Sequence, residues 1–83
     1  MVDLHGLHIA EAKEILRELL PDLGESGLRQ LRIITGSGHH SAGPQQQGRM
    51  FAHVQLLVAQ ELGYHTDEIR DRRGFTGGVV VHF

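Results

Sequence analysis

The sequence is rich in imidazole groups, because seven of its 83 residues are histidine. Histidine exchanges a proton near neutral pH, so it can act as a general acid, a general base or a metal ligand. His5 follows Asp3 by two positions, and His39 and His40 stand together in a turn-rich segment that begins at Gly36. Acid–base catalysis and metal binding are the two kinds of chemistry that these groups support.

The chain opens with an acid and a histidine in an alternating pattern. Val2-Asp3-Leu4-His5 alternates apolar and polar residues and is broken by Gly6, which predicts a short half-buried strand. We expect Val2 and Leu4 to enter the core, and Asp3 and His5 to stand together on the opposite face. A neighbouring carboxylate favours the protonated ring and fixes its tautomer, which suits acid–base catalysis. The alternative is an ordinary polar face of an edge strand.

A second cluster follows the β-branched run of residues 31–35, which predicts another strand. In the segment after this run, glycines leave backbone amides accessible, while His39, His40 and Ser41 add donors and an acid or base. These groups suit a phosphate, and an ordinary glycine turn is the alternative. The glycine spacing does not fit a dinucleotide fingerprint, and the lysine of a Walker A loop is absent.

Two helices are predicted from apolar residues at helical spacing, over residues 8–20 and 49–62. We expect the first to be ended by Pro21, Gly24 and Gly27. The second is expected to stop at the glycine that follows its last leucine.

Two further strands are predicted over residues 64–71 and 78–83, joined by a glycine-rich turn. The βαβαββ order indicates an α/β domain, an α+β two-layer sandwich of a mixed four-stranded sheet and two helices. Its first two strands are expected to be parallel through a right-handed crossover. Ligands of open α/β sheets bind beyond the carboxyl ends of parallel strands. Residues 3–6 and 35–41 are therefore expected to converge at one edge.

Arginine supplies cationic groups at two places in this arrangement. Arg49 stands where the second helix begins, and a helix N-terminus presents unpaired amides and partial positive charge to anions. Arg70, Arg72 and Arg73, followed by Phe75, can grip a nucleic-acid backbone and offer a stacking ring. Solvated arginines are the alternative in both places.

Composition excludes several classes of protein. With 83 residues, of which 40% are hydrophobic and 22% charged, the chain forms one small domain. No apolar stretch approaches the roughly 18 to 20 residues that span a bilayer. The absence of cysteine excludes disulfides, thiolate zinc sites and a thiol nucleophile. We expect a cytoplasmic domain, monomeric when isolated, that belongs to a longer protein and has no membrane partner.

Three motifs occur in a fixed order: residues 2–6 (Val-Asp-Leu-His-Gly), residues 35–41 (Thr-Gly-Ser-Gly-His-His-Ser), and the pair Gly77-Gly78 before the last strand. Together they resemble the small MutS-related (Smr) domain, with its LDLHG-like opening, TGxGxHS-like loop and glycine-containing final hairpin. The resemblance covers essentially the whole chain, so residues 1–83 are expected to be a single Smr-like domain. It implies a fold similar to the C-terminal domain of bacterial translation initiation factor three.

The resemblance also implies nuclease activity on DNA or RNA, and eukaryotic relatives commonly end larger proteins that act on messenger RNA at stalled ribosomes. Compared with the family pattern, Ser37 stands where many relatives have lysine or arginine, and His39 adds an imidazole beside the family histidine. The candidate catalytic residues are Asp3, His5 and His40. The candidate residues for binding phosphate or nucleic acid are Gly36, Ser37, Gly38, His39, Ser41, Arg49, Arg72 and Arg73.

The favoured expectation is cleavage of RNA without an obligatory metal, giving 5′-hydroxyl ends. His5 and His40 are then the acid–base pair, in an order that the sequence leaves open, and Asp3 orients His5. One alternative uses Asp3, His5 and one of the adjacent loop histidines to hold a divalent metal and nick DNA. Another is a module that binds RNA or the ribosome and cleaves nothing.

Overall fold

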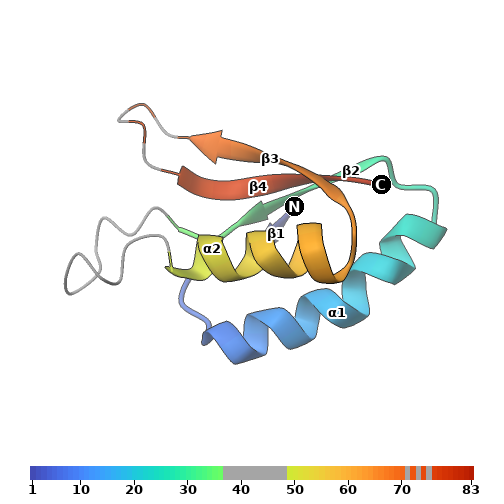
Figure 1. The fold of residues 1–83 in the computed structure, drawn as a ribbon, viewed down its shortest axis with the longest axis horizontal. Coiled ribbons are helices and arrows are strands. Elements are labelled where there is room, and N and C mark those ends of the chain that lie inside the picture. The colour runs from blue at the N-terminus through green and yellow to red at the C-terminus, as the bar shows by residue number, and fades with distance from the viewer. Residues whose placement is uncertain (37–48, 71, 73, 75) are drawn as a thin grey trace.

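The computed structural model describes residues 1–36, 49–70, 72, 74 and 76–83. Two helices cover one face of a four-stranded sheet, as Figure 1 shows, so the predicted two-layer class and element order are confirmed. The elements are β1 (Val2–Asp3), α1 (Ile9–Glu25), β2 (Gln30–Ile34), α2 (Arg49–Leu56), η2 (Leu57–Glu61), β3 (His65–Arg70) and β4 (Thr76–His82). Within these described ranges, no helix has the length and apolar character needed to cross a lipid bilayer.

The sheet is mixed and has the strand order β1-β2-β4-β3. As predicted, β1 and β2 are parallel, with Asp3 paired with Ile34. β4 runs antiparallel to both of its neighbours, β2 and β3. The carboxyl ends of β1 and β2 therefore lie side by side at one edge, where the sequence predicted the site.

The core lies between the sheet and the helices. Alternate residues of β2 and β4 point toward the helices, which is the period of two expected of a half-buried strand. The fully buried large side chains come from the end of β1, both helices, η2 and the two central strands: Leu4, Leu16, Leu20, Ile33, Val54, Val58, Val79 and Val81. The opposite face of the sheet carries no helix of the described residues (Figure 1), and we call it the helix-free face.

The prediction that the first helix ends at Pro21 is wrong, because α1 continues to Glu25 with Pro21 inside it. Proline removes one helical hydrogen bond. Leu20 is buried before it and Leu23 packs against the core after it, so burial on both sides keeps the helix continuous. Gly27, with a φ of +91°, then provides the left-handed residue at which the chain turns away.

The second helix changes its winding before it ends. Helix α2 passes at Leu57 into the π-helical segment η2. The Leu62 N–H donates to the Leu57 carbonyl at 2.9 Å, a bond that spans five residues. The stop at Gly63 is confirmed, with a φ of +79°. The residues of η2 are consequently displaced relative to an ordinary α-helical continuation.

Candidate functional site

A tight turn places His5 at the carboxyl end of β1. The Leu7 N–H donates to the Leu4 carbonyl at 3.1 Å, and Gly6 has a φ of +87°, which the third position of a type II turn requires. Leu4 is only 1% exposed and anchors the turn in the core. His5 follows this anchor directly and is exposed to solvent.

The carboxylate of Asp3 fixes the backbone of this turn. Asp3 Oδ1 accepts a hydrogen bond from the His5 backbone N–H at 2.9 Å. Both residues are exposed while Leu4 between them is buried, so the predicted division into core-facing and outward residues is confirmed. Asp3 acts on the main chain of His5, which sets the direction in which the ring leaves the strand.

The imidazole of His5 lies against the backbone of Gly36. A Cβ atom built on Gly36 would lie 2.9 Å from His5 Cδ2, closer than real Cβ contacts. Gly36 also has a φ of +85°, which disfavours any other residue. The opening motif and the first glycine of the central motif therefore meet at one edge, as their placement after parallel strands predicted.

Backbone hydrogen bonds hold the end of β2 from both sides. On one side the Leu4 N–H donates to the Ile34 carbonyl at 2.7 Å. On the other, the Gly77 carbonyl accepts from the N–H groups of Thr35 and Gly36, at 2.8 and 3.2 Å. The contact between His5 and Gly36 thus rests on three neighbouring segments of backbone.

The glycine pair of the final hairpin, Gly77 and Gly78, lies beside this hydrogen-bonded end of β2, where space is limited. A Cβ atom on Gly78 would overlap the carbonyl oxygen of Ile33, because β4 runs very close to its antiparallel neighbour β2 at this point. A Cβ atom on Gly77 would meet nothing within 4 Å. Only one glycine of the pair is therefore required by the packing of the two strands.

Thr35 is a residue that the sequence analysis did not assign to the site. It is 5% exposed and is the one buried polar side chain among the described residues. Its Oγ1 has no hydrogen-bond partner within that part of the chain. A buried hydroxyl without a partner is unfavourable, and this one is adjacent to Gly36. Thr35 opens the central motif of residues 35–41, but only its burial distinguishes it from the other members of that motif.

The candidate cations have different surroundings. Arg49 is exposed at the first position of α2, which begins at the same end of the molecule as the end of β2 (Figure 1). Arg72 is exposed in the turn between β3 and β4. Arg70, by contrast, bonds Glu68 Oε2 through Nε and Nη2, at 3.0 and 2.7 Å. Arg49 and Arg72 therefore stay candidates for binding an anion, while Arg70 is engaged within its own strand.

Several predicted site residues lie outside the described residues: Ser37, Gly38, His39, His40, Ser41 and Arg73. Their assignments stay predictions. In the described ranges, no group of three or more histidine, aspartate or glutamate side chains is arranged to hold a metal ion. The alternative of a divalent metal site requires His39 or His40, which lie outside the described residues, so it stays a prediction.

The strand register brings together histidines that are distant in the sequence. His65 and His82 face each other across β3 and β4, with ring centroids 5.4 Å apart. His82 Nε2 lies 2.7 Å from Asp67 Oδ2, and His65 Nε2 lies 3.8 Å from Asp67 Oδ1. Because the neighbouring Val81 is buried toward the helices, this cluster lies on the opposite, helix-free face.

Comparison with known proteins gives a family for the chain. The family model described as the Smr domain matches residues 2–83. Polyadenylate-binding protein-interacting protein 7 of Arabidopsis thaliana is 34% identical over 73 residues, which cover 82% of this chain and 13% of that protein. An Smr domain-containing protein of Schizosaccharomyces pombe is 35% identical over 66 residues, which cover 80% of this chain and 32% of that protein. The chain thus spans less than a third of either relative, and no solved structure matches it.

Proposed function

The chain belongs to the Smr domain family, whose members are nuclease-related, and from this we propose that it is an endonuclease domain that cleaves RNA by acid–base chemistry. The observation that carries the proposal is the contact between His5 and Gly36. It brings the histidine of the opening motif to the first glycine of the central motif. A general acid or base and a segment suited to phosphate then share one edge of the sheet.

In the proposed reaction, His5 and His40 act as the acid–base pair. One of them removes the proton of the ribose 2′-hydroxyl, and the 2′-oxygen attacks the adjacent phosphorus. The other gives a proton to the departing 5′-oxygen, which leaves a 2′,3′-cyclic phosphate and a 5′-hydroxyl end. Arg49 and the backbone amides of the glycine-rich segment stabilise the charge of the phosphorane-like transition state.

Asp3 is a positioning residue in this scheme. Its hydrogen bond to the His5 backbone at 2.9 Å fixes the turn from which the ring projects. His5 can then reach a phosphate bound beside Gly36 without reorganising the backbone. Loss of the Asp3 carboxylate should lower the rate by loosening His5 while the ring itself is retained.

RNA is the proposed substrate, with messenger RNA and the ribosome as the proposed context. One relative carries a name that links it to a polyadenylate-binding protein, and polyadenylate is an RNA sequence. This name supports RNA over DNA. The exposed arginines at positions 49 and 72 are the proposed phosphate contacts from the described part of the chain.

The first experiment compares an RNA oligonucleotide with the same oligonucleotide carrying one 2′-deoxy residue at the cleaved position. We expect cleavage of the first with 5′-hydroxyl ends, equally in buffer and in chelator, and resistance of the second. His5→Ala should slow cleavage by about 10²- to 10⁴-fold. His65→Ala, which removes an exposed histidine from β3, is the matched control and should leave the rate unchanged.

Three results would contradict the proposal. Cleavage of the 2′-deoxy substrate would exclude attack by the 2′-hydroxyl. Loss of activity in chelator, with 5′-phosphate ends and activity on DNA, would favour the metal-dependent alternative. RNA binding that survives the combined replacement of Asp3 and His5, without cleavage by the unaltered chain, would favour a binding module.

A further inference from the structure

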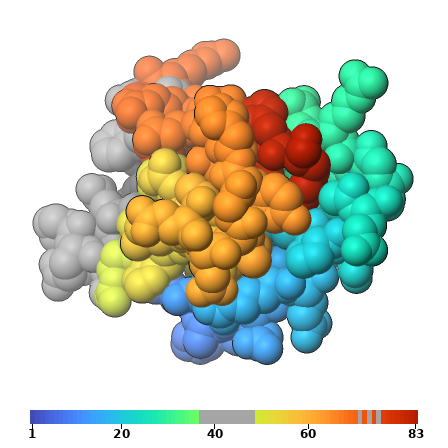
Figure 2. All heavy atoms as spheres, turned by 45° about the vertical axis from the view of Figure 1, so that its right-hand side comes forward, coloured from blue at the N-terminus to red at the C-terminus, as the bar shows by residue number. Residues whose placement is uncertain are grey.

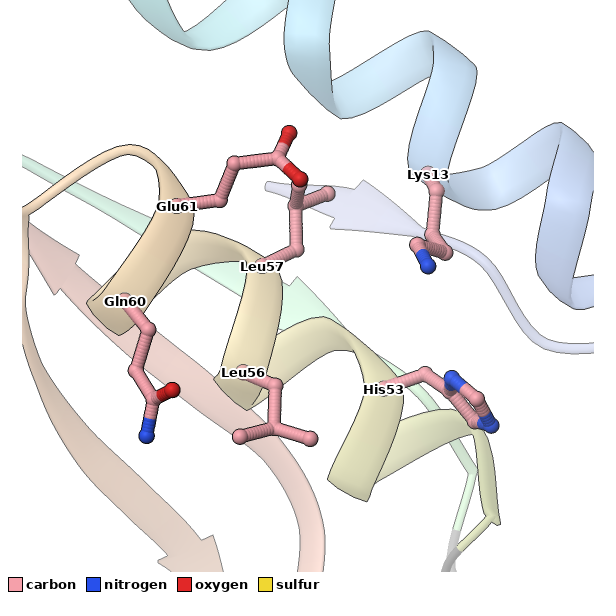
Figure 3. A pocket seen from close by; sticks show the side chains of 6 residues that line it. All are labelled: Lys13, His53, Leu56, Leu57, Gln60 and Glu61. Carbon is pink, nitrogen blue, oxygen red and sulfur yellow. The ribbon is translucent and has the colours of Figure 1, made fainter.

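A hollow of about 360 Å³ lies between the two helices (Figure 3). It is an open groove rather than an enclosed cavity, so a ligand bound there would keep part of its surface in solvent. It is lined by one residue of α1 and five residues of α2 and η2: Lys13, His53, Leu56, Leu57, Gln60 and Glu61. None of these belongs to the candidate cleavage site.

The π-helical segment shapes this hollow. Leu57, the first residue of η2, is 3% exposed, whereas Leu56 beside it is 54% exposed. The hollow therefore has a buried apolar floor and an exposed apolar rim.

The charged groups of the hollow leave it rich in hydrogen-bond donors. Among the described residues, Glu61 is the one carboxylate that lines the hollow, and it is already engaged: Arg17 bonds it through Nε at 2.6 Å and Nη2 at 3.3 Å. This hydrogen bonding lowers the pKa of Glu61, and the charges of Arg17 and Lys13 lower it further. The ammonium of Lys13, the imidazole of His53 and the amide of Gln60 make no hydrogen bond among the described residues and can donate to a ligand.

The cationic groups near the hollow lie close to Arg49, the candidate phosphate-binding residue at the start of α2. His53 follows Arg49 by four positions, so both lie on one face of that helix. Lys13 and Arg17 stand one turn apart on α1. Figure 2 shows α2 and η2, in yellow to orange, lying against α1, in blue, on one surface. We call Lys13, Arg17, Arg49 and His53 the interhelical basic strip.

Glu14 also acts on the strip, because its charge raises the pKa of Arg17. It does not line the hollow. Among the residues that line the hollow, the charge of Glu61 is neutralised by Arg17 and the charge of Lys13 is left over, while Glu11 and Glu18 of α1 do not line it either. A negatively charged ligand that extends from the candidate cleavage site into the hollow therefore has the complementary charge.

We propose that the interhelical hollow binds one flanking nucleotide of the substrate strand, with its phosphate held by Lys13 and His53 and its sugar and base against Leu56. This inference rests on the proposed function, because it takes the strand that enters the hollow to be the one cleaved beside His5. Substrate binding then extends over the helical layer of the domain, beyond the edge where the two motifs meet.

The test measures binding apart from cleavage. A chain carrying Asp3→Asn and His5→Ala is titrated into a fluorescein-labelled 12-nucleotide single-stranded RNA, and anisotropy is followed between 50 and 200 mM KCl. In this background Lys13→Gln should raise Kd about fivefold at the lowest salt. It should also reduce the steepness of the log Kd against log salt plot by about 0.7, the value for one lost single-strand phosphate contact.

Arg32→Gln is the matched control. It removes the same charge from an exposed residue on the helix-free face, because its neighbours Leu31 and Ile33 point into the core. We expect its Kd to match that of the background chain. His53→Gln should weaken binding as Lys13→Gln does, and all variants should keep the melting temperature of the background chain.

Equal effects of Lys13→Gln and Arg32→Gln, or no effect of either, would overturn the inference, as would the absence of RNA binding. Octaglutamate is also tested as a competitor against the labelled RNA. If it displaces that RNA as effectively as unlabelled RNA does, the hollow is a site for acidic peptides and the inference is overturned. Cleavage by the unaltered chain is scored separately. A chain that cleaves nothing but binds RNA through Lys13 would refute the proposed function and leave the binding surface intact.

Discussion

The ring of His5 packs on the backbone of Gly36, where a Cβ atom would stand 2.9 Å from His5 Cδ2. The two residues follow two parallel strands, and the hydrogen bond from Leu4 to Ile34 holds those strand ends together. Any side chain at position 36 would occupy the place of the imidazole. The glycine is therefore required by the position of a proposed catalytic group as well as by its own backbone angle.

Gly36→Ala should lower both stability and cleavage. The positive φ alone should reduce the free energy of unfolding by about 1–2 kcal/mol. The new methyl group also displaces the His5 ring, so the cleavage rate should fall by more than about tenfold. Gly27→Ala is the matched control, because Gly27 has a φ of +91° and nothing within 4 Å of its Cβ position. Chemical denaturation and cleavage assays on both variants measure the two effects, and equal cleavage rates would contradict the steric role.

Gly78→Ala should destabilise the domain strongly. Its methyl group would overlap the carbonyl oxygen of Ile33, and a backbone atom in a sheet cannot swing aside as a flexible side chain can. We expect a loss of about 3 kcal/mol or more in the free energy of unfolding. Gly77→Ala is the control, because nothing lies within 4 Å of the Cβ position of Gly77. Its free energy of unfolding should fall by less than about 1 kcal/mol. Similar urea midpoints for the two variants would disprove the close approach of β2 and β4.

Thr35→Val should preserve or raise stability. The Thr35 hydroxyl is buried without a partner among the described residues, so a methyl group in its place removes an unsatisfied polar atom. The expected gain in the free energy of unfolding is up to about 1 kcal/mol. Thr66→Val, at a half-exposed position of β3, should change little. A thermal denaturation measurement in which Thr35→Val loses 1 kcal/mol or more would mean that the hydroxyl is satisfied in solution.

The ion pair between Arg17 and Glu61 should make stability fall in acid. The hydrogen bond from Arg17 lowers the pKa of Glu61 below its ordinary value of 4.5. A carboxylate with a lowered pKa in the folded state stabilises the fold above its unfolded pKa, and loses that contribution as the pH falls through the folded value. The stabilisation is therefore complete at pH 7 and declines below about pH 4.5.

Glu61→Gln is the variant that checks this pH dependence. Its melting temperature should lie below that of the unaltered chain at pH 7, and the difference should shrink at pH 3. Glu18→Gln removes an exposed carboxylate of α1 that makes no hydrogen bond among the described residues, and serves as the control. A difference for Glu61→Gln that stays constant from pH 7 to pH 3 would show that the ion pair contributes nothing to stability.

The sequence by itself determined the elements whose signals are local. The β-branched run of residues 31–35 and the helical spacing in residues 49–62 predicted a strand and a helix close to those observed. The order of elements also predicted parallel β1 and β2, and from that the meeting of His5 with the start of the central motif. Local pattern failed at Pro21, because the burial of Leu20 and Leu23 by distant segments decides whether the helix continues.

Only the tertiary structure decided the contacts between residues that no local pattern relates. The bond between Arg17 and Glu61 joins positions 44 apart, and the pairing of His65 with His82 depends on the register of a hairpin. The hollow beside Lys13 depends on how two helices pack and on the π-helical winding of η2. Periodicity records which face of an element is buried, whereas the partner across that face is fixed by the packing of the whole chain.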